Sequence, residues 1–517
     1  MITMGATTPP GIGITRLLDY PLARCPDKTA YIDDHGDITF AELERQAARL
    51  SQAIAEAGAQ PGDRAAVILP NGIPFIVAET AMLRSGMVKV PLNIRFHPKE
   101  VLYSLADCEP SILVCDADFA DAVMEKRGDL PSLRQIYVVS AKADGCASYD
   151  EIVSGGDATF TTVPYDSDGP VLIRYTGGTT GRPKGIVHAA ASFLAISLDV
   201  IRELTLRHDD VALHLGHLSH GLNFMWAAYH SVGITQILRE TFDPESVLVD
   251  IETHGVTFVY MVPTMVQRLL REDDGQADTS SLRMFMYSSA PMPVPVLRQA
   301  IERYGDIFSQ VYTLSEAPVI TTMMRVEEHI DRQTSVGHRL ASCGREVVTM
   351  ELRLVDDDMV EVPQGEVGEI AVRSVNNMAE YWRLPEETAA TLVDGWLRTG
   401  DMAVRDEDGY LHIVDRKKDV IITGAFNVYP KEVENVLYQH PAVAQAAVVG
   451  VPDEEWGETI KAVVVVKPDT TVTAEELIGL CRDNLANYKK PRVIEFADAL
   501  PLSPVGKIMR RALRSDS

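Results

Sequence analysis

The stretch Tyr175-Thr176-Gly177-Gly178-Thr179-Thr180-Gly181-Arg182-Pro183-Lys184-Gly185 gathers four glycines and three threonines between two apolar segments. Val171-Leu172-Ile173 before it has the pattern of a buried strand, and apolar residues resume at Ile186, so we expect a loop anchored at both ends. Glycine lets backbone N–H groups approach phosphate oxygens, threonine adds hydroxyl donors, and Lys184 adds a positive charge. The stretch therefore predicts a polyphosphate-binding loop. It fits neither the Walker pattern nor G-x-G-x-x-G, and an ordinary surface loop is the alternative.

This run resembles the signature loop of the adenylate-forming superfamily, which contains acyl-CoA synthetases, luciferases and peptide-synthetase adenylation domains. Most members have serine where Gly177 stands, but glycine also occurs there among fatty-acid and aryl-acid ligases. The resemblance implies that ATP is bound by Thr176, Gly177, Gly178, Thr179, Thr180, Gly181 and Lys184.

Composition sets limits on the kind of protein. The chain has 517 residues, 46% of them hydrophobic, and a formal net charge of −26. This length predicts two or more domains, and the acidic excess argues against a nucleic-acid binder or docking to anionic lipid. Six scattered cysteines without a C-x-x-C pair favour reduced, mostly buried thiols. Because no signal sequence or long apolar run is present, we expect a cytoplasmic protein without an integral membrane segment.

The first 165 residues alternate helix-like and strand-like patterns. A helix is predicted from Phe40 to Ala57 with Thr39 as N-cap and Gly58 at its end, and strands are predicted at residues 64–69 and 111–115. This alternation predicts an α/β fold with parallel strands. The resemblance adds an expected division into residues 1–416, with parallel α/β subdomains and a small β-barrel subdomain, and a small mobile α+β domain of residues 417–517.

Three histidines recur at intervals of three, at His214, His217 and His220. Imidazoles at this spacing share a helix face and could bind a metal, but two interspersed glycines oppose a helix and no Cys or carboxylate cluster accompanies them, so we do not expect a metal site. In the resembling enzymes this segment lies beside the carboxylic acid. That assigns His220 to catalysis and to the acid pocket, with Phe224 and Met225 nearby. Phe224 and Met225 could equally be ordinary core residues.

Two later segments resemble the nucleotide site of the superfamily. Residues 286–291 are expected to line the adenine slot through Ser289, Ala290 and Pro291. Residues 310–316 are expected to supply the Tyr312 ring for adenine and the Glu316 carboxylate for catalysis and for Mg²⁺ bound with ATP, since aromatic faces stack on purines and hard cations prefer carboxylate oxygen. By itself, this second segment also suits a helix N-cap.

Within that second segment, Thr313 stands where relatives usually have glycine, and Ser315 stands where they usually have threonine. Both are assigned to the nucleotide site. In addition, Thr313 is expected at the floor of the acid pocket, where its stiff β-branched side chain favours an aryl or short-to-medium-chain acid.

Residues 365–373 alternate like a half-buried strand of the small barrel. The resemblance then assigns Asp401, after a Thr-Gly turn, to the ribose hydroxyls and Arg416 to ribose and the α-phosphate. Lys418 matches the hinge of the C-terminal domain. A strand is predicted at residues 463–466 and a helix at residues 475–487.

Coenzyme A and the catalytic lysine are assigned to the C-terminal region. Gly424 falls in a loop that resembles the segment acting in the second half-reaction, and Trp456 and Lys490 match positions near the nucleotide end of coenzyme A. Both side chains could also be ordinary surface residues. Lys507, in a Gly-Lys-Ile frame, matches the lysine that neutralises charge during displacement of pyrophosphate.

These residues together predict an ATP-dependent carboxylic acid–CoA ligase that uses Mg²⁺. One alternative is an enzyme that loads a carrier protein, disfavoured because the chain ends ten residues after Lys507 without a carrier domain. Another is a nucleotide sensor without ligase activity. A homodimer is the expected assembly.

Overall fold

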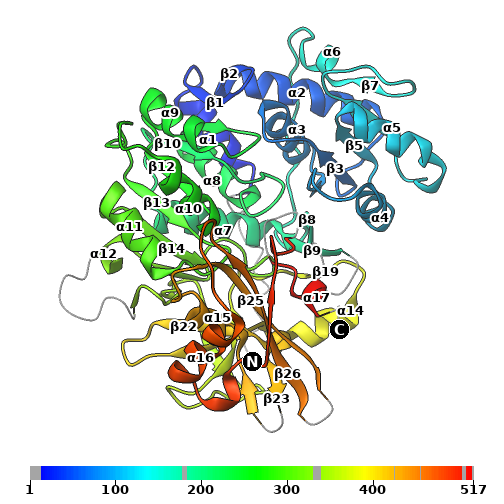
Figure 1. Cartoon of the computed structure of the whole chain (residues 1–517). Helices are drawn as coiled ribbons and strands as arrows, with labels where there is room; N and C mark the ends of the chain where they lie inside the picture. The colour runs from blue at the N-terminus through cyan, green and yellow to red at the C-terminus, as the bar shows by residue number, and fades with distance from the viewer. Residues whose placement is uncertain are drawn as a thin grey trace, which may run out of the picture. The chain divides into compact units, whose positions relative to one another are not determined.

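The computed structural model describes residues 13–176, 183–329, 339–423, 426–453, 456–502 and 508–514. They form a mixed α/β chain, which confirms the predicted fold class. The chain divides into two compact units, one of residues 1–351 with 373–397 and the other of residues 352–372 with 398–517. Figure 1 shows the elements in chain order from blue to red. The boundary of a mobile C-terminal domain between residues 416 and 417 stays a prediction.

Two large, mainly parallel sheets form the framework of the first unit. One has the strand order β16 (Arg345–Glu346), β15 (Thr322–Met324), β14 (Phe308–Tyr312), β13 (Met284–Tyr287), β12 (Phe258–Met261), β10 (Val211–His214), β11 (Thr235–Leu238), β1 (Thr29–Asp33) and β2 (Gly36–Thr39). The other has the order β19 (Glu380–Tyr381), β9 (Lys184–Ala189), β8 (Pro170–Thr176), β4 (Val88–Pro91), β3 (Arg64–Ile68), β5 (Ile112–Cys115), β6 (Gln135–Val138) and β7 (Ala147–Ser148). The strands predicted at residues 64–69 and 111–115 are β3 and β5, and they pair in parallel.

Buried apolar side chains arrange the helices of this unit in layers. One face of the nine-stranded sheet packs against α9 (Pro244–His254), α10 (Pro263–Glu272) and α11 (Val294–Tyr304). A large shared core joins its other face to the eight-stranded sheet through α1 (Arg16–Arg24), α2 (Phe40–Glu56), α3 (Ile73–Arg84), α6 (Tyr149–Val153), α7 (Ala190–Glu203) and α8 (Asn223–Val232). The far face of the eight-stranded sheet packs against α4 (Pro98–Cys108) and α5 (Ala117–Glu125). Two short helices, α12 (Val326–His329) and α14 (Pro385–Thr391), complete the described α-helices of the unit, and residues Arg127–Asp129 form a 3-10 turn.

Local sequence explains where α2 begins and ends. Thr39 Oγ1 accepts a hydrogen bond from the Glu42 backbone N–H at 3.2 Å, which confirms the predicted N-cap. Gly58 follows the helix with a φ of +79°, a conformation that glycine adopts without a steric penalty.

The predicted small barrel corresponds to a five-stranded sheet, most of which lies in the second unit. It has the order β17 (Glu351–Val355), β18 (Gly368–Arg373), β21 (Trp396–Arg405) and β20 (Leu392–Val393), with β22 (Leu411–Arg416) beside β21. The predicted half-buried alternation of β18 is wrong, since every residue from Gly368 to Val372 is buried. The polar side chain Glu369 is buried because its carboxylate pairs with Arg398 and Lys417 and accepts a hydrogen bond from the Gly400 backbone N–H.

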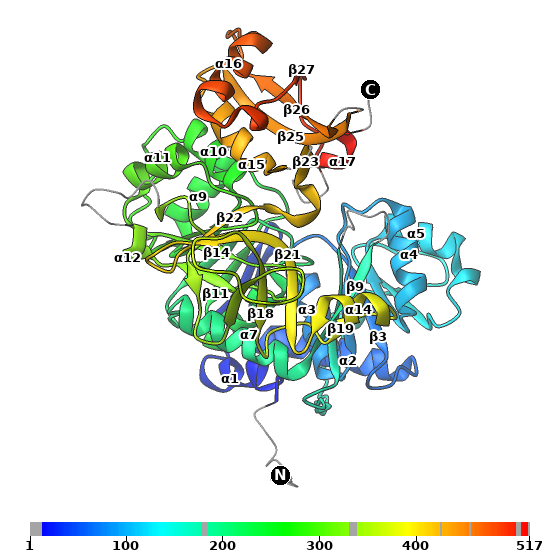
Figure 2. The same ribbon diagram turned by 90° about the horizontal axis from the view of Figure 1, so that it is seen from below.

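The last sheet of the second unit has the order β24 (Phe426–Val428), β23 (Ile421–Thr423), β26 (Gly457–Val466) and β25 (Val443–Asp453), with β27 (Val493–Phe496) paired to β26. It packs with α15 (Pro430–Leu437) and α16 (Ala474–Asn484), and α17 (Arg510–Leu513) contacts β25 (Figure 2). The predicted strand at residues 463–466 lies in β26, and the predicted helix at residues 475–487 is α16, which ends three residues earlier at Asn484.

The predictions about thiols and membrane segments concern the whole chain. None of the six cysteines forms a disulfide in the described structure, and four of them are buried, as predicted. No helix among the described residues is long and apolar enough to cross a bilayer.

Candidate active site

Two antiparallel strands hold the signature loop. Strand β8 runs to Thr176 and β9 begins at Lys184, and these two residues are partners in the β8–β9 register. Gly177, Gly178, Thr179, Thr180 and Gly181, which were assigned to ATP, lie outside the described residues. A Cβ added to Gly185 would stand 2.9 Å from Ile173 Cγ2 and 3.1 Å from Trp382 Cβ, so only glycine permits this close approach.

Lys184 and Glu316 meet at the same tyrosine. The Lys184 Nζ atom lies 5.3 Å from the centre of the Tyr381 ring, and the Tyr381 hydroxyl donates a hydrogen bond to Glu316 Oε1 at 2.9 Å. Burial, with a further contribution from Glu316, raises the pKa of Tyr381, so its hydroxyl stays protonated and acts as a donor. The backbone N–H of Met378 donates to the Glu316 carbonyl at 2.7 Å. Residues 378–381, which sequence reasoning missed, therefore fix the position of Glu316.

Arg174 and His188 hold Ser315 from the other side, and sequence reasoning missed both. Arg174 Nη2 donates to Ser315 Oγ at 2.5 Å, and His188 Nε2 donates to the Ser315 carbonyl at 3.0 Å. Burial lowers the pKa of His188 to about 3 and that of Arg174 to about 10, although Glu316 acts on Arg174 in the opposite direction. His188 is therefore neutral. The sequence does contain a signal for Arg174, because it is a charged residue inside the otherwise apolar run of residues 171–175.

Loops at the carboxyl ends of neighbouring parallel strands carry the residues assigned to adenine. Ser289, Ala290 and Pro291 follow β13 and are exposed. Ser289 adopts a φ of +74°, and its Oγ lies 2.8 Å from the hydroxyl of Tyr260, at the end of β12. Loops in this position form the usual ligand crevice of an open α/β sheet.

The adjacent strand β14 ends at Tyr312, which is 8% exposed, and Thr313 follows, half-buried, with its Oγ1 3.4 Å from the Ala317 carbonyl oxygen. The alternative of a helix N-cap is wrong, because residues 313–320 form no helix. The backbone stays irregular here and places Ser315 and Glu316 beside Arg174 and Tyr381. Contact of Thr313 with an acid stays a prediction.

The three histidines do not share a helix face. His214 ends β10 and its Nε2 lies 2.9 Å from Gln236 Oε1, whereas His217 and His220 lie in the turn before α8. Burial lowers the pKa of His214 and of His217 to about 4. No group of three or more His, Cys, Asp or Glu side chains suited to a metal occurs within the described ranges. A role for His220 beside the acid stays a prediction.

Phe224 and Met225 lie in the first turn of α8 and are fully or almost fully buried in the shared core. Phe224 packs between Phe193 and His188, with ring centroids 5.8 and 5.0 Å apart, and the Arg174 Cζ atom lies 5.7 Å from its ring centre. Phe224 is thus both a core residue and a neighbour of the Arg174–Ser315 pair.

In the second unit, the two residues assigned to ribose are paired with each other. Asp401 and Arg416 are register partners of β21 and β22, and Arg416 Nε lies 2.6 Å from Asp401 Oδ1. Asp401 is 4% exposed. The expected Thr-Gly turn is wrong, because Gly400, with a φ of +70°, lies within β21.

Three further assignments concern the C-terminal region. Lys418 lies in a 3-10 turn of residues Lys417–Asp419, and burial lowers the pKa of its ammonium group. Trp456 packs under Arg492, whose Cζ lies 4.9 Å from the indole, and Arg492 follows Lys490 by two residues. Gly424 and Lys507 lie outside the described residues.

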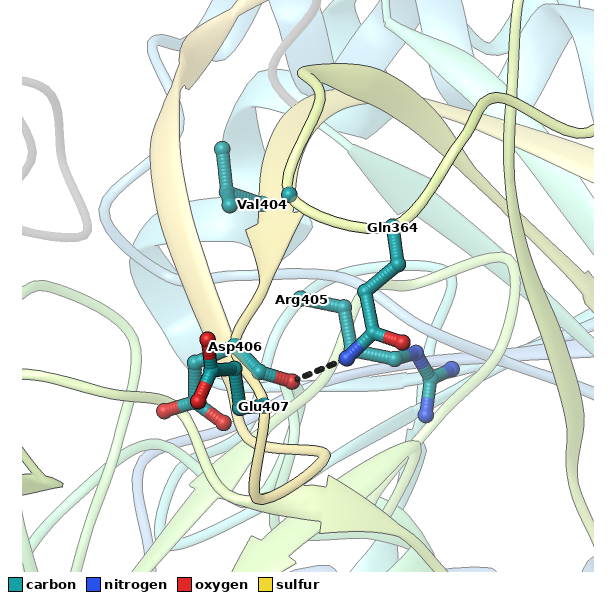
Figure 3. A pocket seen from close by; sticks show the side chains of 6 residues that line it. Gln364, Val404, Arg405, Asp406 and Glu407 are labelled. Carbon is teal, nitrogen blue, oxygen red and sulfur yellow. Dashed lines mark hydrogen bonds between the residues drawn. The ribbon is translucent and has the colours of Figure 1, made fainter.

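A surface depression of about 570 Å³ lies beside the β21–β22 connection (Figure 3). Gln364 crosses it and donates a hydrogen bond to the Asp406 carbonyl at 3.1 Å. None of the residues assigned to a site lines this depression, so it is not the candidate active site.

Comparisons with known proteins cover nearly the whole chain. A feruloyl-CoA synthase from Amycolatopsis sp is 37% identical over 95% of this chain and 96% of its own length. A fatty acid–[acyl-carrier-protein] ligase, ScoC, from Streptomyces coeruleorubidus is 34% identical over 95% and 93% of the two chains. The crystal structure of ATP-bound MatB from Rhodopseudomonas palustris superimposes with a TM-score of 0.88 at 30% identity, covering 97% of both chains.

Two protein-family models match the chain, in agreement with these relatives. Residues 432–507 match the AMP-binding enzyme C-terminal domain. Residues 18–382, which include the signature loop, Ser315, Glu316 and Tyr381, match the AMP-binding enzyme family, and the chain therefore belongs to that family.

Proposed function

We propose that the protein is an ATP-dependent carboxylic acid–CoA ligase. It joins an acid to coenzyme A through an acyl-adenylate and releases pyrophosphate and then AMP. The observation that carries the proposal is the meeting of Lys184, Tyr381 and Glu316 at the strands that hold the signature loop. A cation and an oriented carboxylate at a glycine-rich loop suit the binding of a metal-complexed polyphosphate.

In the first half-reaction, the acid carboxylate attacks the α-phosphorus of ATP and pyrophosphate leaves. Lys184 and the signature loop would hold the phosphates, Ser289 and Tyr312 would flank adenine, and Asp401, oriented by Arg416, would accept the ribose hydroxyls. Lys507 is proposed to neutralise the charge that develops during displacement. The protein would form no covalent intermediate, so positioning and electrostatics would account for most of the rate.

Glu316 fits the expected magnesium ion. Its Oε1 accepts from Tyr381, while Oε2 accepts no hydrogen bond from any residue that the structure describes, and a carboxylate oxygen is the ligand type that Mg²⁺ prefers. When bound with ATP, the ion would reduce the negative charge of the phosphates.

In the second half-reaction, the thiol of coenzyme A attacks the acyl carbonyl and AMP leaves. A rotation about Lys418 would bring the Gly424 loop to the reacting groups. Trp456, Lys490 and Arg492 would bind the nucleotide end of coenzyme A, since an aromatic ring and two cations suit a phosphorylated adenosine.

An aryl or short-to-medium-chain acid is the proposed substrate class. Thr313, half-buried at the end of β14, supports a compact pocket, and the feruloyl-CoA synthase shows that an aryl acid is used by a relative. His220 and Phe224 would contact the acid. A homodimer and a cytoplasmic location stay predictions.

The alternative function is transfer of the acyl group to a carrier protein, because the relative ScoC is named as a fatty acid–[acyl-carrier-protein] ligase. Pyrophosphate release should be measured with MgATP over a panel of ferulate, other aryl acids, and straight-chain acids of increasing length, and the best acid then combined with either coenzyme A or a phosphopantetheinylated carrier protein. We expect acid-dependent release and transfer to coenzyme A. Release followed by transfer to the carrier alone would favour the second function, and no release with any acid would favour a nucleotide sensor.

A further inference from the structure

Arg174 is a buried cation without a carboxylate partner. It is 4% exposed and lies in the middle of β8, between Ile173 and Tyr175, whose side chains pack on the opposite face of the sheet. Its Nη2 donates to the Ser315 hydroxyl, and its Nε has no hydrogen-bond partner. Among the described residues, no carboxylate forms an ion pair with it. Glu316 is near enough to act on its charge but makes no direct contact, and a buried guanidinium without a direct ion pair is costly, so this arrangement needs a reason beyond packing.

The other arginine that is buried among the described residues has direct carboxylate partners. Arg84 is 3% exposed and lies 2.5 Å from Asp19 Oδ1 and 2.8 Å from Glu44 Oε2. It joins α3 to α1 and α2 through two carboxylates, as a structural arginine is expected to do. Arg174 differs because the protein supplies only a neutral hydroxyl to its fork. The fork is suited to an anion with two oxygens.

Arg174 also stands between the two groups of residues assigned to the two substrates. Its Cζ lies 5.7 Å from the centre of the Phe224 ring, on the side assigned to the acid. Its Nη2 contacts Ser315, next to Glu316, on the side assigned to the nucleotide. The carboxylate of the acid must lie where these two sides meet, because it attacks the α-phosphorus.

We propose that Arg174 binds the reacting carboxylate of the acid substrate and holds it for attack on ATP. This inference rests on the proposed function and adds a substrate-binding residue to it. The guanidinium would offset the repulsion between the incoming carboxylate and Glu316, and one fork would restrict the rotation of the nucleophile. Once the acyl-adenylate has formed, the acyl carbonyl carries no charge. Arg174 therefore contributes to the first half-reaction and much less to the second.

The proposal predicts an unusual combination of effects for Arg174→Met. Replacing a buried cation that has no direct ion pair by an apolar side chain of similar length is commonly neutral or stabilising, so thermal stability should be kept or increased. Binding of the acid should nevertheless weaken by about tenfold or more, as expected for the loss of a charge-assisted hydrogen bond. Arg174→Lys should recover part of this loss, because it keeps the charge without the fork. The matched control Arg84→Met should lose stability, because it leaves two carboxylates without their partner.

The test measures binding without turnover. Dissociation constants of ferulate and of its primary carboxamide are determined by calorimetry in the presence of magnesium and α,β-methylene-ATP, which cannot release pyrophosphate. If another acid of the panel turns over better, that acid and its carboxamide are used. The wild type should bind the carboxylate about tenfold more tightly than the carboxamide, and Arg174→Met should bind both alike. Acyl-CoA formation from supplied acyl-AMP should change little.

Three results would overturn the proposal. The first is that Arg174→Met still binds the carboxylate more tightly than the carboxamide, and the second is that the rates of both half-reactions fall equally. The third is that only binding of the nucleotide weakens, which would make Arg174 a support for Ser315 alone. Failure of the proposed function is a different result, because the wild type would then release no pyrophosphate with any acid of the panel.

Discussion

The hydroxyl of Tyr381 can be removed without disturbing its neighbours, which makes Tyr381→Phe a direct test of the Glu316 site. The hydroxyl donates to Glu316 Oε1 at 2.9 Å, while the ring packs against Lys184 Nζ at 5.3 Å. Phenylalanine keeps the ring and loses only the donor. Glu316 would then be free to turn away from the orientation that suits a magnesium ion.

The size of the effect follows from the type of bond. A hydrogen bond to a charged group contributes about 1.5–3 kcal/mol, and the lower end applies because Glu316 is only half-buried and water can replace the donor. About 1.5 kcal/mol corresponds to a loss of roughly tenfold in kcat/KM for MgATP. The magnesium concentration needed for half-maximal rate should rise, and the KM for the acid should change little.

Pyrophosphate release measured against magnesium and ATP concentration provides the assay. Tyr304→Phe is the matched control, since the Tyr304 hydroxyl donates to Asp273 Oδ2 at 2.8 Å, and neither residue is assigned to the site. The control should leave the magnesium dependence unchanged. A Tyr381→Phe enzyme with wild-type magnesium dependence would refute the role given to this hydrogen bond.

Four further changes test other parts of the reasoning. Lys507→Ala should lower adenylation by roughly 10²-fold and affect thioester formation from supplied acyl-AMP much less; equal losses in the two separate assays would point to a role in folding. Lys418→Pro fixes φ near about −65° and should spare pyrophosphate release but suppress acyl-CoA formation, so full overall turnover would remove the hinge assignment. Thr313→Gly should raise kcat/KM for acids longer than the best native one, because each additional buried methylene contributes about 0.8 kcal/mol, and an unchanged chain-length profile would exclude Thr313 from the pocket floor. Burial, with a smaller effect of Arg84, lowers the pKa of His230 from 6.5 to about 3, so its contribution to stability is complete above pH 6.5 and is lost as the pH falls toward 3. The free energy of unfolding, measured with urea between pH 6.5 and 5, should fall less steeply with decreasing pH in His230→Gln than in the wild type, by up to about 1.4 kcal/mol per pH unit. The same pH dependence in both proteins would mean that His230 is already protonated in the folded protein.

The sequence alone determined the fold class, the family and most of the individual elements. These features are encoded locally: the signature loop is one continuous run, α2 has its own N-cap, and the strand at residues 112–115 is an unbroken apolar segment. Local patterns failed where neighbours decide the environment. Strand β18 was expected to be half-buried, but its polar residue Glu369 is buried as well, because Arg398 and Lys417 from other segments pair with its carboxylate.

Only the tertiary structure decided which side chains surround Ser315 and Glu316. Tyr381 lies 65 positions after Glu316, and Arg174 lies 141 positions before Ser315, so neither contact follows from sequence spacing. Tyr381 reaches the site because β19 pairs with β9, and Arg174 faces it because alternate residues of β8 point to opposite faces of the sheet. Strand order and register are set by the packing of the whole unit, and this is why the residues that hold the reacting groups became visible only in the folded chain.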